Sequence, residues 1–171
     1  MVACGFLRGK PSPPNRGVPN RLGLLIMSLE VVAIAADHAG FSLKQELAEL
    51  LTSSGYQVLD LGTNSGLSVD YPDFAQKMAE AIRAGTANRG VLVCGSGIGI
   101  GIAANRFPGV RAATCTSATL ARLARAHNDA NVISLGARII GFETARDCVL
   151  TFLSTPFDGG DRHQRRIDKL G

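Results

Sequence analysis

From residue 29 onward, short runs of apolar residues alternate with stretches in which apolar residues recur every three or four positions. The short runs end at glycine or polar residues, which predicts buried β-strands. The other stretches have the spacing of amphipathic helices, as in the leucines at 43, 47, 50 and 51. Strands are predicted over 31–36, 56–61, 90–94, 111–115 and 132–135, and helices over 41–54, 71–85, from the glycine-rich run to 104, 116–127 and 141–154.

This alternation favours a parallel sheet covered by helices on both faces. Because crossovers between parallel strands are right-handed, we expect an α/β fold, a three-layer αβα sandwich with a Rossmann-like parallel five-stranded sheet. The 171 residues suit one domain, expected over 28–171 and ending in a C-terminal arm. Ligands of such sheets bind outside the carboxyl ends of the strands, where candidate chemistry is therefore sought.

The first 27 residues differ from the rest in composition. They are rich in proline, glycine and arginine, which favours a flexible basic N-terminal extension, either native or an artefact if translation begins at Met27. Glu30 interrupts the apolar stretch before it and argues against a signal peptide. The formal charge is +4, and residues 1–26 hold four basic residues and no acidic one. The remainder is formally neutral, which argues against a nucleic-acid partner.

Cysteine spacing and hydropathy narrow the class of protein further. The four cysteines at 4, 94, 115 and 148 form no C-x-x-C pair, so we expect neither an ordinary zinc site nor a disulfide framework. Reduced thiols are typical of a cytoplasmic protein. No uninterrupted apolar run reaches about 18 residues, so no membrane span or membrane partner is expected.

The strongest local signal is the run Gly95-Ser96-Gly97-Ile98-Gly99, which follows a predicted strand. Glycines there let backbone N–H groups approach an anionic ligand, and close helix–sheet packing without a ligand is the alternative. A dinucleotide site needs an acidic residue about 20 positions downstream. No Asp or Glu lies between 81 and 128, so a small anionic ligand fits the run better.

Several side chains flank the strand ends and could carry chemistry. Cys94 precedes the glycine run, and its thiol is either a base or nucleophile or a buried small hydrophobe. His38 follows Asp37 after the first predicted strand and is either a ligand contact or a structural histidine. His127 lies where a helix gives way to a strand, so helix capping competes with a catalytic role.

A basic cluster near the C-terminus contains Arg162, His163 and Arg166. Arg162 and Arg166 share a face if the segment is helical. Two arginines and a histidine can hold a phosphate through charge-assisted hydrogen bonds. The alternative is a solvated basic tail.

Together these motifs resemble the type B ribose-5-phosphate isomerases, a family that includes the subunits of galactose-6-phosphate isomerase. The resemblance implies an enzyme that interconverts aldose and ketose phosphates through a cis-enediolate, with no metal and no organic cofactor. Ribose 5-phosphate is the expected substrate. The alternatives are another sugar phosphate (allose or galactose 6-phosphate, or a four-carbon ketose phosphate) and a non-catalytic phosphate-binding module. The matching motifs, between about 31 and 168, are Asp37-His38-Ala39-Gly40, Asp70-Tyr71-Pro72, Cys94 to Gly99, Ala103-Ala104-Asn105, His127 to Asn131, and Arg162-His163 with Arg166.

The resemblance also implies catalytic roles. Cys94 matches the family's base, which moves a proton between C2 and C1 of the sugar. The loop from Gly95 to Gly99 would donate N–H groups to the developing oxyanion, with Ser96 assisting proton transfer at the sugar hydroxyls. His127 matches the residue that opens the sugar ring, with Asp37 as its helper.

Binding roles and assembly follow from the same resemblance. One departure from the family pattern is Asp161, which could compete with phosphate for Arg162. Gly99 stands where some relatives have a glutamate base, which favours Cys94 as the base here. Family members are dimers in which histidine and arginine side chains reach a neighbour's loop. We therefore expect a homodimer with composite active sites, or a tetramer built from it. Asn128 would hold a sugar oxygen. The residues His38, Arg162 and Arg166 match ligand contacts that are made mainly with the phosphate, and His163 is a further expected contact with the substrate.

Overall fold

The computed structural model describes Met1 and residues 29–170, and the predicted extension over 1–27 lies almost wholly outside them. The strands are β1 (Val31–Ala36), β2 (Gln57–Asp60), β3 (Arg89–Cys94), β4 (Ala112–Thr114) and β5 (Val132–Gly136). The helices are α1 (Phe41–Ser53), α2 (Tyr71–Arg83), α3 (Ile98–Ala104), α4 (Ala118–Asn128), α5 (Phe142–Ser154) and α6 (Asp161–Ile167). Every predicted strand and helix is present, with ends shifted by a few residues.

The five strands form one parallel sheet in the order β2-β1-β3-β5-β4. From β1 the chain first adds β2 on one side and then returns to add β3 on the other. The carboxyl ends of β1 and β3 therefore flank a topological switch point, where sheets of this kind bind ligands. The predicted Rossmann-like three-layer sandwich is confirmed.

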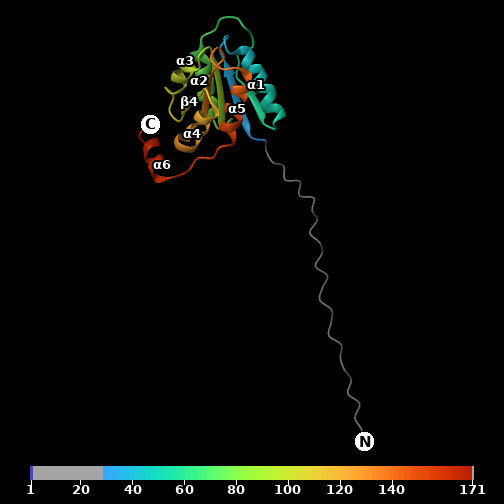
Figure 1. Cartoon of the computed structure of the whole chain (residues 1–171), viewed down its shortest axis with the longest axis vertical. Helices are drawn as coiled ribbons and strands as arrows, with labels where there is room; N and C mark the ends of the chain where they lie inside the picture. Colours follow the sequence, from blue (N-terminus) through green and yellow to red (C-terminus); the bar gives the residue numbers. More distant parts are fainter. Residues whose placement is uncertain (2–28, 171) are drawn as a thin grey trace.

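Helices cover both faces of the sheet, with α3 and α1 on opposite sides (Figure 1). Helices α1, α4 and α5 pack on one face, over alternate strand residues such as Ile34 and Val91. Helices α2 and α3 pack on the other face, over Ala33, Leu92 and Cys94. This period-two alternation within strands that are buried on both faces explains why they appear as continuous apolar runs in the sequence.

One ion pair, between a buried lysine and a half-exposed aspartate, ties the first helix to the second strand. Lys44 of α1 is only 1% exposed, and its ammonium donates to Oδ1 of Asp60 at 2.7 Å. The same oxygen accepts the N–H of Gly62 at 2.9 Å. The pair therefore fixes the loop that leaves the carboxyl end of β2.

Helix α6 was not among the predicted elements. Its only buried residue is Ile167, so the segment lacks the repeated apolar spacing from which an amphipathic helix is predicted. It packs against α4, near the C-terminal end of the described chain (Figure 1).

Among the helices of residues 29–170, none is long and apolar enough to cross a membrane.

Candidate active site

A cleft of about 580 Å³ opens at the carboxyl ends of β1 and β3. It lies at the topological switch point of the sheet, between β1 and β3. Its lining contains Asp37, His38, Ala39, Tyr71, Cys94, Gly95, Ser96, Ile98, Gly99, Arg138 and Ile139.

Cys94 is the last residue of β3 and is 4% exposed. The N–H of Gly97 donates to its sulfur at 3.1 Å, because Gly97 turns the chain back with a φ of 77°. The sulfur therefore has a backbone donor, and Cys94 is a nearly buried residue that also lines the cleft.

The glycines of the loop are required by close packing as well as by the cleft. A Cβ on Gly97 would lie 2.8 Å from the carbonyl carbon of Leu135, and one on Gly101 would lie 2.7 Å from Oγ of Ser134. A Cβ on Gly99 would lie 2.8 Å from the ring of Tyr71. Close packing therefore requires glycine at these three positions. Gly95 and Gly99 also line the cleft.

Asp37 and His38 form the wall of the cleft at the end of β1. Asp37 is 6% exposed, and its Oδ1 accepts the N–H of Gly40 at 3.0 Å. Nδ1 of His38 lies 3.2 Å from the backbone nitrogen of Val69 and 3.3 Å from its oxygen. The ring is thus held through Nδ1, and its Nε2 makes no hydrogen bond within residues 29–170.

Arg138 is a cation of the cleft that the sequence reasoning missed. Its side chain passes within 3.5–3.6 Å of the point where a Cβ on Gly95 would stand. It follows β5 by two residues, and β5 pairs with β3. The pattern that could have found it is an arginine just beyond the carboxyl end of a predicted strand.

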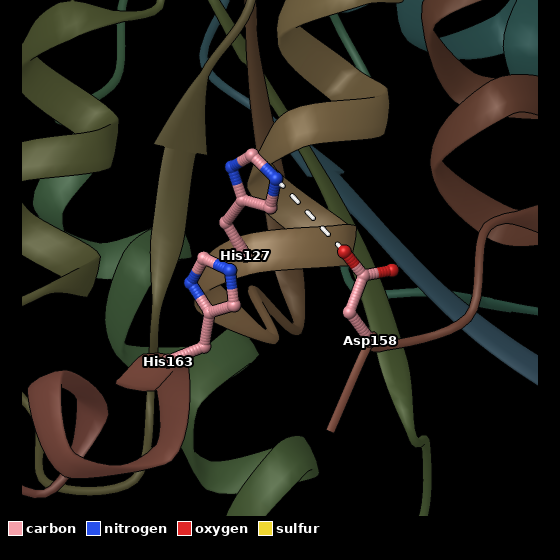
Figure 2. A group of neighbouring side chains, drawn as sticks. All are labelled: His127, Asp158 and His163. Carbon is pink, nitrogen blue, oxygen red and sulfur yellow. Dashed lines mark ion pairs between the residues drawn. The ribbon is translucent and has the colours of Figure 1, made fainter. Parts of the chain in front are cut away.

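The other predicted site residues gather at the opposite end of the sheet. His127 lies in the last turn of α4, and its ring stacks on that of His163 with centroids 4.5 Å apart. Nε2 of His127 lies 3.9 Å from Oδ2 of Asp158, which Figure 2 shows as a dashed line. The pKa of His163 is lowered from its usual value. The largest cause is the removal of solvent from the ring, and the smaller causes are the positive charges of His127, Arg162 and Arg166. Asn128 and Arg166 are exposed in the same region.

Strand β5 separates the two groups. It begins at Val132, shortly after His127, and ends at Gly136, which pairs with Cys94. A strand of this length spans roughly 13 Å, so one chain does not bring His127 to Cys94. Asp161 forms no ion pair with Arg162 within the described chain.

Within residues 29–170, only His127, Asp158 and His163 form a group of three side chains placed to hold a metal ion. The cleft beside Cys94 offers no such group in that part of the chain. Backbone N–H groups, a thiol, a carboxylate, an imidazole and a guanidinium surround the cleft. These groups can transfer a proton and bind an anion.

Comparison with known proteins finds close relatives over nearly all of the described chain. A sequence model of the family described as Ribose/Galactose Isomerase matches residues 32–170. Ribose-5-phosphate isomerase B of Escherichia coli is 42% identical over 142 residues, which cover 83% of this chain and 95% of that protein. D-erythrulose-4-phosphate isomerase of Pectobacterium atrosepticum is 40% identical over 141 residues, 82% of this chain and 92% of that protein. The crystal structure of a ribose 5-phosphate isomerase from Thermotoga maritima is 52% identical, covers 82% of this chain and 97% of its own, and has a TM-score of 0.81.

Proposed function

The chain belongs to the ribose/galactose isomerase family and is a sugar-phosphate isomerase, and we propose that it interconverts ribose 5-phosphate and ribulose 5-phosphate. The observation that carries the proposal is the position of Cys94. Cys94 lines a cleft of about 580 Å³, and its sulfur accepts an N–H from Gly97 at 3.1 Å. A backbone donor suits a sulfur that carries negative charge, which is the form that removes a proton.

In the proposed reaction the Cys94 thiolate removes the proton from C2 of the open-chain sugar and returns it to C1. The intermediate is a cis-enediolate whose negative charge lies on oxygen. Backbone N–H groups of the loop from Gly95 to Gly99 stabilise that charge without reorganising, because their positions are fixed by packing against β5. Ser96 assists proton exchange between the two sugar oxygens.

Ring opening needs a residue from a second copy of the chain. His127 lies at the far end of the sheet from Cys94, so we assign it to the active site of a neighbouring subunit, with Asp37 as its helper there and Asn128 on a sugar oxygen. Ile98 and Ile102 of α3, beside the cleft, are 57% and 61% exposed. Such an apolar surface next to an incomplete site supports a homodimer, or a tetramer of two such dimers.

The phosphate lies among cations drawn from both subunits in this proposal. His38 and Arg138 line the cleft on one subunit. Arg162 and Arg166, with His163 beside them, come from the exposed arm of the other subunit. Guanidinium groups suit this role because they bind phosphate through paired hydrogen bonds.

A four-carbon substrate is the second candidate, favoured by the 40% identity to a D-erythrulose-4-phosphate isomerase. A six-carbon aldose phosphate is the third, because the family model covers galactose as well as ribose isomerases. The cleft chemistry is the same for all three, and only the chain length of the sugar differs.

The test compares initial rates on ribose 5-phosphate, in EDTA, for the wild type, Cys94→Ala and Cys148→Ala. Removing the base should lower kcat by roughly 10²–10⁴-fold while substrate still binds. Cys148 is buried in the core on the opposite face of the sheet from Cys94. The Cys148→Ala variant therefore controls for the loss of a buried thiol and should keep the wild-type rate. A Cys94→Ala enzyme with unchanged turnover would refute the role of the base. An inactive wild type that isomerises a four- or six-carbon phosphate would change the substrate and keep the mechanism.

Composite sites can be tested by co-expressing Cys94→Ala and His127→Ala chains. A mixed dimer has one site with both changes and one intact site. Random pairing makes half of the dimers mixed, so the mixture should regain about a quarter of wild-type activity. Recovery no greater than the sum of the two variants would show that each chain forms its own site.

A further inference from the structure

Two histidines and an aspartate converge beside the end of α4 (Figure 2). His127 belongs to α4, His163 to α6, and Asp158 to the segment between α5 and α6. One ligand-type atom from each residue lies within 4.8 Å of the other two. In Figure 2 a nitrogen of each ring is turned toward the Asp158 carboxylate. Three donors from three segments therefore face one small volume.

We propose that this His–Asp–His trio (His127, Asp158 and His163) binds a divalent transition-metal ion of the Zn²⁺ type, and that the bound ion inhibits the isomerase. Two imidazole nitrogens and one carboxylate oxygen suit Zn²⁺, whereas Mg²⁺ and Ca²⁺ prefer sites made of oxygen. Zn²⁺ with three protein ligands leaves a fourth position to water.

The trio can reach ligand geometry by small side-chain rotations. Zn²⁺ bonds to nitrogen and oxygen are about 2.0–2.2 Å long, so ligand atoms lie roughly 3.3 Å apart around the ion. The side chains of His127 and Asp158 are 43% and 54% exposed, which leaves them room to move closer. The trio is also anchored through the backbone, where the N–H of Asp158 donates to the oxygen of Ala126 at 3.0 Å.

Nearby arginines limit the affinity of the site. Nη2 of Arg162 lies 3.5 Å from Nε2 of His163 and must turn away to admit a cation. Arg162 is exposed, so this rotation is open to it. The positive charges of Arg162 and Arg166 oppose a dication, which makes the site a reversible one rather than a permanent structural centre.

Inhibition rests on the proposed function, in which His127 moves a proton during ring opening. A metal ion on Nε2 of His127 occupies the lone pair that would accept this proton. Metal binding itself does not depend on the reaction and can be measured on a chain of any activity.

The first experiment titrates Zn²⁺ into the full chain carrying Cys94→Ala, which removes the cleft thiol as a competing ligand, and follows the heat released. We expect one ion per chain, and at least about tenfold weaker binding when Asp158→Asn is added. Asp168→Asn makes the same charge change at an exposed aspartate just after α6 and should leave the affinity unchanged. Absence of binding, or equal binding with and without Asp158→Asn, would overturn the site.

The second experiment measures isomerase rates with increasing Zn²⁺, each variant relative to its own metal-free rate. The concentration for half inhibition should rise at least about tenfold in Asp158→Asn, and EDTA should restore the lost rate. Equal inhibition of the wild type and Asp158→Asn would overturn the inhibitory role and assign the effect to another ligand such as Cys94. A chain that binds Zn²⁺ through the trio and isomerises no sugar phosphate would refute the proposed function and support the metal site.

Discussion

The geometry of the loop after Cys94 can be tested with a single methyl group. Gly97 has a φ of 77°, and a Cβ there would stand 2.8 Å from the carbonyl carbon of Leu135, about 0.6 Å inside the 3.4 Å at which ordinary contact begins. Alanine in this left-handed conformation costs roughly 1–2 kcal/mol. Overpacking against immobile backbone adds about 1–3 kcal/mol.

Gly55, just after α1, offers a matched control. Its φ is 87°, and nothing lies within 4 Å of the position of its Cβ. Gly55→Ala therefore has the conformational penalty without the contact. In urea titrations both variants should lose stability, and Gly97→Ala should lose at least about 1 kcal/mol more.

The activities of the two variants should differ more sharply than their stabilities. Shifting Gly97 moves the N–H that donates to the Cys94 sulfur, along with its neighbours in the loop. Because a displacement of an ångström can reduce turnover on the order of 10²-fold, we expect kcat of Gly97→Ala to fall roughly 10- to 100-fold. Gly55→Ala should retain the wild-type kcat. A Gly97→Ala enzyme with normal kcat, or equal losses in both variants, would refute the claim that this backbone position controls the reaction.

Other parts of the molecule give four further predictions. His127→Ala should slow a cyclic substrate roughly 10²-fold or more but spare an open-chain analogue, and equal losses would argue against ring opening. Arg166→Ala should raise KM for the phosphorylated sugar with little change in kcat, so a normal KM would place the phosphate elsewhere. Asp60→Asn should lower the free energy of unfolding by about 1–2 kcal/mol in urea titrations, because it leaves the buried Lys44 ammonium without its counter-ion while solvent at the half-exposed Asp60 side screens part of the charge; adding Lys44→Met should recover part of the loss. Prolonged treatment with EDTA should leave isomerase activity intact, and inactivation would contradict metal-independent chemistry.

The strands and most helices were predictable because their signals are local. The apolar run over 31–36 and the leucine spacing over 41–54 match β1 and α1 within one residue. Helix α6 was missed for the same reason, since it buries only Ile167. A helix held by one apolar contact and by packing on another helix leaves little periodicity in its own sequence.

Part of the site was also within reach of the sequence. Asp37 and His38 follow one apolar run and Cys94 ends another, and parallel strands bring such positions to one edge of the sheet. The cleft confirms that they lie together. The position of Arg138 in the same cleft depends on β5 lying beside β3, a strand order that the alternation of strands and helices leaves open.

The sequence by itself determined the fold class, the family and which residue types could carry the chemistry, because apolar periodicity and short motifs are properties of neighbouring residues. Only the tertiary structure decided which candidates meet within one chain. It placed Arg138 in the same cleft as Cys94 at one edge of the sheet, and it stacked His163 on His127 at the other. Such contacts depend on strand order and on the docking of α6, which are set by packing between segments far apart in the chain rather than by the residues adjacent to each candidate.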